Sequence, residues 1–169
     1  MENWKDIEVN FADEFLSKVE HDLVEKYCAD AKFKYGEVDD YESDDPPTGM
    51  VHEIPETEFI YKMFRKHIHD RLKFTHEMKL YRMYVNIFAP TENPYFHLDG
   101  EGITFIYYPN KDYHMQWGGE TQIVVDNNIH GVIPIPNRLL FFNGNLWHRA
   151  TSFRNRHRFT VAIKYKPSK

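Results

Sequence analysis

The chain has 169 residues, a length that suits one domain, and its net charge is −5. A hydrophobic fraction of 41%, with 16% aromatic residues, excludes a disordered chain. The single cysteine, Cys28, excludes an internal disulfide framework and argues against a cysteine-based zinc site. No apolar run approaches the roughly 20 residues of a membrane span, and no signal peptide is recognisable, so we expect a cytoplasmic protein with no membrane contact.

Charge is distributed unevenly along the sequence. Up to Glu58 the chain has 18 acidic and 5 basic residues, and from Phe59 onward it has 8 acidic and 16 basic residues. The acidic part favours a basic protein or peptide partner. The basic part favours nucleic acid or an anionic co-substrate. A solvated surface without a partner would give the same counts.

The first third of the chain predicts helices. Apolar residues recur at close to helical spacing from Phe11 to Tyr27 and predict an amphipathic helix over 11–29. The stretch 39–49 is acidic and contains two adjacent prolines, which predicts an exposed loop. A second helix is expected over 56–76, with Met63 and Ile68 on its apolar side, and the helical part should end near Lys79.

Short aromatic and β-branched runs follow, separated by Pro, Gly and Asn. They predict strands over 80–88, 103–109, 120–125, 131–134, 138–142 and 157–165. We therefore expect a mainly β fold faced by N-terminal helices. A double-stranded β-helix (a jelly-roll, cupin-like core) fits this spacing, although periodicity alone does not separate it from other β-sandwiches. The expected organisation is a single domain, 1–169, with helical support and an acidic loop in 1–79 and the β-core in 80–166.

A His-x-Asp pair, His97 and Asp99, is the first candidate for a metal-binding site. Residues two apart on a strand share a face, so both side chains would reach one ion. His148 follows much later, after the expected strand 138–142. Two imidazoles and one carboxylate form the facial triad of non-haem Fe(II) oxygenases and leave coordination positions open. The pair by itself also fits a surface histidine beside a turn aspartate.

Two further features of the sequence favour a metal site with an anionic co-substrate. Arg158, Thr160 and Ala162 would share one face of the last strand, where a planar guanidinium suits the distal carboxylate of an anionic co-substrate. Thr104, Ile106 and Tyr108 alternate onto one face of the strand 103–109, and a buried tyrosine hydroxyl needs a partner. An ordinary basic stretch and two core aromatic residues are the competing explanations.

These segments together resemble the prolyl 4-hydroxylase family of 2-oxoglutarate oxygenases. The similarity lies in Ile103 to Tyr113, in Gly118-Gly119-Glu120-Thr121, in Arg138-Leu139-Leu140-Phe141-Phe142 leading to His148, and in Arg158 with the strand ending at Tyr165. The segments closely resemble those of the hypoxia-type protein prolyl hydroxylases and of compact microbial and viral relatives. The resemblance covers about residues 80–166.

The resemblance implies a role for each matching residue. His97, Asp99 and His148 would hold iron. Arg158 and Tyr108 would bind the distal carboxylate of 2-oxoglutarate, and Thr104 and Ile106 would line the co-substrate pocket. The cofactor and co-substrates implied are Fe(II), 2-oxoglutarate and O2, with ascorbate as an additional reductant. The reaction would hydroxylate a prolyl residue of a protein or peptide and release succinate and CO2, with no general base required.

The sequence departs from the hypoxia-type enzymes at two positions. Where those enzymes place a tyrosine near the metal, the register gives Ile87, with Tyr84 three residues earlier. Where they carry a tryptophan near the end of the last strand, Lys164 stands here. Both departures bear on the expected substrate pocket and leave the iron and co-substrate sites intact.

Three expectations concern the mouth of the site. The acidic stretch 39–53 would act as a lid that favours a basic substrate, although a solvated loop explains it equally. Trp117, beside Gly118-Gly119, would lie on the pocket rim. Trp147 would face away from the metal and lie in the core.

Two other functions fit parts of the sequence. Nucleic-acid dealkylating dioxygenases share the His-x-Asp pair and the distal histidine, and they carry a basic residue six positions after the co-substrate arginine, where Lys164 falls. A non-catalytic sugar- or peptide-binding jelly roll with a vestigial metal site is the second alternative. The oligomeric state is not indicated by the sequence.

Overall fold

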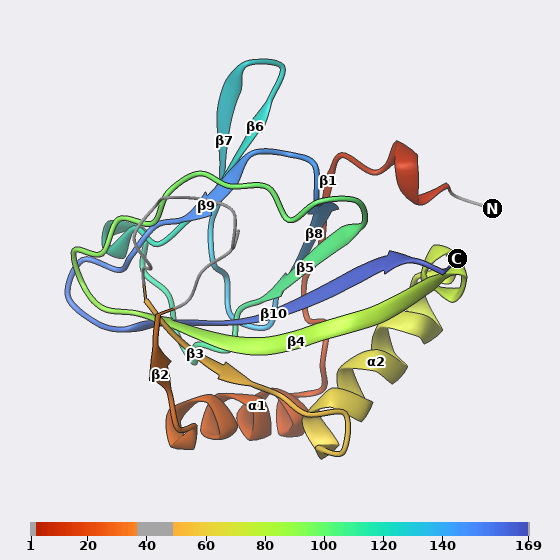
Figure 1. The fold of residues 1–169 in the computed structure, drawn as a ribbon. Helices are drawn as coiled ribbons and strands as arrows, with labels where there is room; N and C mark the ends of the chain where they lie inside the picture. The colour runs from red at the N-terminus through yellow and green to blue at the C-terminus, as the bar shows by residue number, and fades with distance from the viewer. Residues whose placement is uncertain (1–2, 37–48, 169) are drawn as a thin grey trace.

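The computed structural model describes residues 3–36 and 49–168. Its strands form two antiparallel sheets, as expected for a double-stranded β-helix (Figure 1). In chain order the strands are β1 (Val9–Ala12), β2 (Lys34–Tyr35), β3 (Met50–Glu53), β4 (Met78–Phe88), β5 (Ile103–Tyr107), β6 (Thr121–Val125), β7 (Asn128–Val132), β8 (Leu139–Asn143), β9 (His148–Ala150) and β10 (Arg158–Pro167).

The larger sheet has seven strands in the order β1-β8-β5-β10-β4-β3-β2, and the smaller has the order β7-β6-β9. The longest ladder joins β10 to β4 in antiparallel register, from Arg158 opposite Phe88 to Pro167 opposite Met78. Since sequence-distant strands are adjacent, residues from β4, β5 and β10 lie side by side at the centre of the larger sheet.

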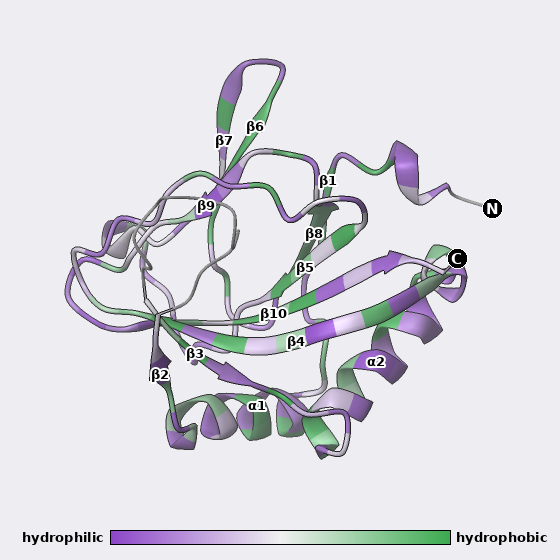
Figure 2. Cartoon of the chain, in the orientation of Figure 1, coloured by the Kyte–Doolittle hydropathy of each residue, from purple (hydrophilic) through white to green (hydrophobic). Residues whose placement is uncertain are grey.

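Two helices, α1 (Lys18–Asp30) and α2 (Phe59–Arg71), lie along one face of the larger sheet (Figure 1). Both helices mix hydrophobic and hydrophilic residues (Figure 2), which suits elements with one buried side. In the part of the chain that the structure describes, no helix is long and apolar enough to cross a membrane.

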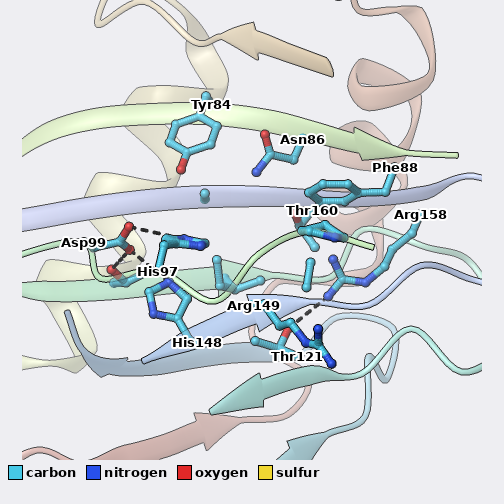
Figure 3. A pocket seen from close by; sticks show the side chains of 15 residues that line it. Tyr84, Asn86, Phe88, His97, Asp99, Thr121, His148, Arg149, Arg158 and Thr160 are labelled. Carbon is cyan, nitrogen blue, oxygen red and sulfur yellow. Dashed lines mark hydrogen bonds and ion pairs between the residues drawn. The ribbon is translucent and has the colours of Figure 1, made fainter. Parts of the chain in front are cut away.

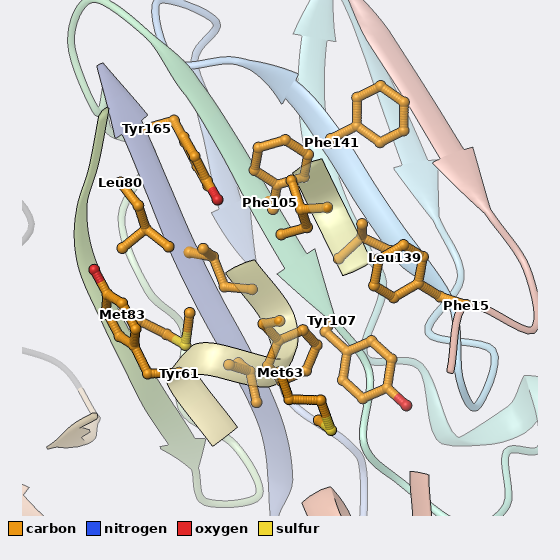
Figure 4. Packing of buried hydrophobic residues seen from close by; sticks show 14 of the residues in the cluster. Phe15, Tyr61, Met63, Leu80, Met83, Phe105, Tyr107, Leu139, Phe141 and Tyr165 are labelled. Carbon is orange, nitrogen blue, oxygen red and sulfur yellow. The ribbon is translucent and has the colours of Figure 1, made fainter. Parts of the chain in front are cut away.

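Alternation along the central strands divides the interior into two parts. Phe105 and Tyr107 of β5 and Ile163 of β10 pack toward the helices, in a core with Phe64 and Ile68 of α2 (Figure 4). The alternate residues of the same strands face the smaller sheet, where a second cluster contains Tyr108, Ile123, Leu140 and Phe142. Strand periodicity thus places one set of side chains in the core and the other set between the sheets.

The expected helix over 11–29 is partly wrong. Residues 9–12 form β1, which pairs with β8, and the helix begins only after Ser17. The Ser17 hydroxyl accepts from the Glu20 backbone N–H while the Glu20 carboxylate accepts from the Ser17 backbone N–H, a capping box that fixes this start. The expected apolar face is also wrong, because Phe11 is 53% and Val19 79% exposed, whereas His21, Val24 and Cys28 are buried.

The second helix ends earlier than expected. α2 ends at Arg71, and a 3-10 turn over Lys73–Glu77 leads into β4. The expected strands all exist, with bounds shifted by a few residues. Four strands, β1, β2, β3 and β9, were not anticipated because each has only two to four residues.

Candidate metal and co-substrate site

A pocket lies between the two sheets and is lined mainly by the central strands (Figure 3). Strand β4 contributes Tyr84, Asn86 and Phe88, and β10 contributes Arg158, Thr160 and Ala162. The other lining residues are Pro94, His97, Asp99, Thr104, Ile106, Thr121, His148, Arg149 and Ala150. The pocket therefore combines imidazole, carboxylate and guanidinium groups in one space.

At one end of the pocket, His97, Asp99 and His148 converge. One ligand atom from each lies within 4.8 Å of the others. His148 Nε2 is 3.4 Å from Asp99 Oδ2, and His97 Nε2 is 3.8 Å from Asp99 Oδ1. The three donors match the ligand set of a 2-His-1-carboxylate iron site.

Backbone contacts fix the positions of these side chains. The N–H of His97 donates to the His148 carbonyl at 3.0 Å, and the N–H of His148 donates to the His97 carbonyl at 3.1 Å. The Asp99 N–H donates to the Gly144 carbonyl at 2.9 Å. A reciprocal bridge thus holds together two histidines that are 51 positions apart in sequence.

The tautomers of both histidines suit metal binding. His148 Nδ1 lies 2.8 Å from the Leu146 carbonyl oxygen, and His97 Nδ1 lies 3.2 Å from the Tyr95 carbonyl oxygen. Because a carbonyl only accepts, each Nδ1 carries the proton in the neutral ring and each Nε2 keeps its lone pair. The residues present therefore fit a divalent metal.

The Asp99 carboxylate is buried and bound on both oxygens. Thr104 Oγ1 donates to Oδ2, and Lys164 Nζ donates to Oδ1 at 2.6 Å. Burial by itself would raise the pKa of the Asp99 carboxyl, but the neighbouring His148 imidazole and the Lys164 ammonium hold the pKa well below its usual value. Asp99 is therefore ionised, as a metal ligand must be.

The other end of the pocket is built around Arg158, whose side chain is fully buried (Figure 3). Its Nε donates to the Gly119 carbonyl at 2.8 Å, and a terminal nitrogen donates to Thr121 Oγ1 at 2.9 Å. Burial lowers the pKa of Arg158, but a guanidinium titrates so high that it stays charged. A buried cation facing a pocket offers a binding point for an anion.

The structure brings together most of the residues singled out from sequence. His97, Asp99 and His148 cluster as expected. Arg158, Thr160 and Ala162 share one pocket-facing side of β10, and Thr104 and Ile106 line the pocket from β5.

Tyr108 lies next to the Arg158 end of the pocket. It is buried, but it is not among the residues that line the pocket. Its hydroxyl lies 2.8 Å from Thr121 Oγ1, which in turn accepts from Arg158. Tyr108 is therefore connected to the arginine through Thr121.

Four residues named from the sequence lie around the pocket. Of Tyr84 and Ile87, Tyr84 lines the pocket and Ile87 does not. Trp117 is also absent from the lining and packs against Tyr113 and Phe153. Trp147 is 52% exposed, so the expectation that it lies in the core is wrong.

The acidic stretch 39–53 falls mostly outside the described residues. Its end, Met50–Glu53, is strand β3, which pairs with β4, so this part is sheet and not lid.

Sequence reasoning named Lys164 but not its contact with Asp99, and it missed Asn86 and Arg149, which line the pocket. Lys164 continues the same alternation as Arg158, Thr160 and Ala162, so strand periodicity was a usable signal for it. Arg149 lines the pocket and its Nε donates to Gln122 Oε1 at 2.9 Å. No sequence pattern singles out Arg149.

The two sheets with this pocket between them form a double-stranded β-helix fold. No family model and no curated protein match the sequence. Among solved structures, a Pseudomonas putida prolyl-4-hydroxylase superposes with a TM-score of 0.79 at 15% identity, over 96% of this chain and 94% of that one.

Two further structures are similar. A Trichoplax adhaerens prolyl hydroxylase, in complex with a hypoxia inducible factor oxygen degradation domain peptide fragment, has a TM-score of 0.76 at 16% identity, over 96% and 85% of the chains. The viral collagen prolyl hydroxylase of Paramecium Bursaria Chlorella virus-1, solved as a 2OG complex, has 0.69 at 14% identity, over 98% and 99%. The chain thus shares the fold of these hydroxylases over nearly its whole length.

Proposed function

We infer that this chain is an Fe(II)- and 2-oxoglutarate-dependent dioxygenase. The observation that carries the proposal is the content of the pocket: a 2-His-1-carboxylate cluster at one end and a buried, cationic Arg158 at the other. A metal needs the first group, and a dianionic co-substrate needs the second. The similarity in fold to prolyl hydroxylases supports the same conclusion.

Each residue has a definite task in this proposal. His97, Asp99 and His148 hold the metal through Nε2, a carboxylate oxygen and Nε2. Arg158 binds the distal carboxylate of 2-oxoglutarate, with Tyr108 orienting it through Thr121. Thr104 orients Asp99, and Ile106 covers one wall of the co-substrate pocket and keeps water out.

Bound Fe(II) and 2-oxoglutarate would supply the oxidation itself, which consumes O2, releases succinate and CO2 and hydroxylates a C–H bond. Ascorbate would serve only to keep the metal reduced. The functional unit proposed is the whole chain, 1–169, as a single domain.

The substrate proposed is a prolyl residue of a protein or peptide. The complex of the Trichoplax adhaerens enzyme with a peptide supports a peptide substrate. The excess of acidic residues before Phe59 supports a basic one.

The test is Fe(II)-dependent conversion of 2-oxoglutarate to succinate, with mass spectrometry on a panel of proline-containing basic peptides. We expect turnover with a gain of one oxygen on a peptide, and no turnover in His97→Ala. Succinate without peptide oxidation would retain the dioxygenase and reject the peptide, and methylated oligonucleotides would then be tested, since Lys164 stands where dealkylating enzymes carry a basic residue. Absence of both turnover and metal binding would indicate the non-catalytic jelly roll.

A further inference from the structure

Lys164 is a buried cation in contact with the carboxylate of the metal cluster. It lies on β10, on the same side as Arg158, and its Nζ is 2.6 Å from Asp99 Oδ1. The side chains of Lys164 and Asp99 are 6% and 3% exposed. Lysine is among the residues least often buried, and burial without a reason is costly.

The contact neutralises the site before a metal arrives. The charges of Lys164 and Asp99 cancel, so the metal-free pocket has a compensated ion pair at this end. A divalent metal would then bring two positive charges beside a buried ammonium, with Arg158 as a further cation in the same pocket. Because buried charges are weakly screened, this arrangement opposes binding of the metal alone.

A dianion in the same pocket reverses that balance. Two negative charges offset those of the metal, and Arg158 faces the anion from the end of the pocket opposite Asp99, while Lys164 stays paired with Asp99 (Figure 3 shows Asp99 and Arg158 at these two ends). The cost that Lys164 imposes on the metal alone therefore disappears when both ligands are present.

We propose that Lys164 makes metal binding conditional on the anionic co-substrate. It is a positioning and coupling residue, and the inference rests on the proposed metal and 2-oxoglutarate site. Lys164 also fixes the orientation of Asp99 together with Thr104, because the two side chains engage different oxygens of the carboxylate. The consequence is that the protein avoids holding a metal without 2-oxoglutarate.

The experiment measures Mn(II) affinity by titration calorimetry, with and without saturating 2-oxoglutarate, in the wild type and in Lys164→Met. Lys164→Gln, which keeps a donor to Asp99 without the charge, is measured in the same way. Lys166→Met is the matched control, since it removes the next lysine of the same strand, an exposed one. Thermal unfolding of each variant, with and without Mn(II), gives a second readout.

We expect both Lys164 variants to bind Mn(II) alone at least about tenfold more tightly than the wild type. The factor by which 2-oxoglutarate tightens Mn(II) binding should fall correspondingly, and Lys166→Met should behave as the wild type. Without metal, Lys164→Met should have a lower Tm because Asp99 loses its cation, and Mn(II) should restore that Tm.

A merely structural Lys164 gives a different result. In that case the variants lose Tm that Mn(II) does not restore, their Mn(II) affinity is unchanged or weaker, and the effect of 2-oxoglutarate on it is that of the wild type. This result overturns the inference and leaves the proposed function standing. A wild-type protein that binds no Mn(II) under either condition overturns the proposed function as well.

Discussion

Replacing Arg158 by methionine separates a binding role from a structural role. In the described residues, 3–36 and 49–168, Arg158 forms no salt bridge with an acidic side chain, and its hydrogen bonds go to the Gly119 carbonyl and to Thr121. Burial of such a cation costs several kcal/mol, and the two hydrogen bonds that the charged guanidinium donates stabilise the fold by about 1.5–3 kcal/mol each. These contributions nearly cancel, so methionine, which keeps the unbranched, apolar part of the side chain, should change Tm by only a few degrees.

The effect on 2-oxoglutarate should be much larger. Losing a forked, charge-assisted contact to a carboxylate removes about 3 kcal/mol, which corresponds to a rise of about a hundredfold in KM for 2-oxoglutarate. Succinate formation at varied 2-oxoglutarate measures KM, and thermal unfolding with and without 2-oxoglutarate measures stabilisation by the ligand. A large drop in Tm with KM unchanged would refute the assignment, because Arg158 would then serve the fold and not the co-substrate.

Three further results are expected. Ser17→Ala removes the cap of α1 and should cost about 1 kcal/mol of unfolding free energy in urea at pH 7. Hydrogen bonds from Ser17 and His67 lower the pKa of Glu20 from 4.5 to about 2, so their stabilisation is present above pH 4.5 and is lost as pH falls toward 2. The difference in unfolding free energy between variant and wild type should therefore shrink over this range, and a constant difference would contradict this. Gly102→Ala should be severely destabilising, because φ is +143° and a Cβ would collide with the carbonyl oxygen of Tyr165. Gly100→Ala is the control, since φ is +85° with open space around it, and it should cost only about 1 kcal/mol. Equal losses of Tm in the two variants would show that the collision at Gly102 is relieved by a small shift of its neighbours. Neutralising Asp39, Asp40, Asp44 and Asp45 together should raise KM for a basic peptide and leave KM for 2-oxoglutarate unchanged, and an unchanged peptide KM would reject the acidic stretch as a substrate contact.

Strand alternation explains why so much of the site was predictable. Once 157–165 is a strand, Arg158, Thr160 and Ala162 must share a side, and the same rule places Thr104 with Ile106. His97 and Asp99 do not lie on a strand, since His97 forms only an isolated bridge with His148, yet their side chains still converge with His148. The contact of Lys164 with Asp99 follows the same parity, but its meaning needs the fold, because 65 residues separate the two.

The errors have physical causes as well. Phe11, Phe15, Val19 and Leu23 recur every four residues, and this spacing drifts around a helix of 3.6 residues per turn, so it does not define one buried face. The capping signature of Ser17 and Glu20 was the better signal for the helix start. Trp147 directly precedes His148, but its side chain is 52% exposed, so an aromatic residue next to a metal ligand in the chain need not lie in the core.

The central claim is that the pocket carries out a 2-oxoglutarate-dependent dioxygenation, and isotope labelling tests it most directly. The purified protein is supplied with Fe(II), 2-oxoglutarate and ¹⁸O-labelled O2, and the succinate formed is analysed by mass spectrometry, with His148→Ala as the control. We expect one labelled oxygen atom in the succinate of the wild type and no succinate above background in the variant. Succinate without label, or equal succinate from His148→Ala, would contradict the account.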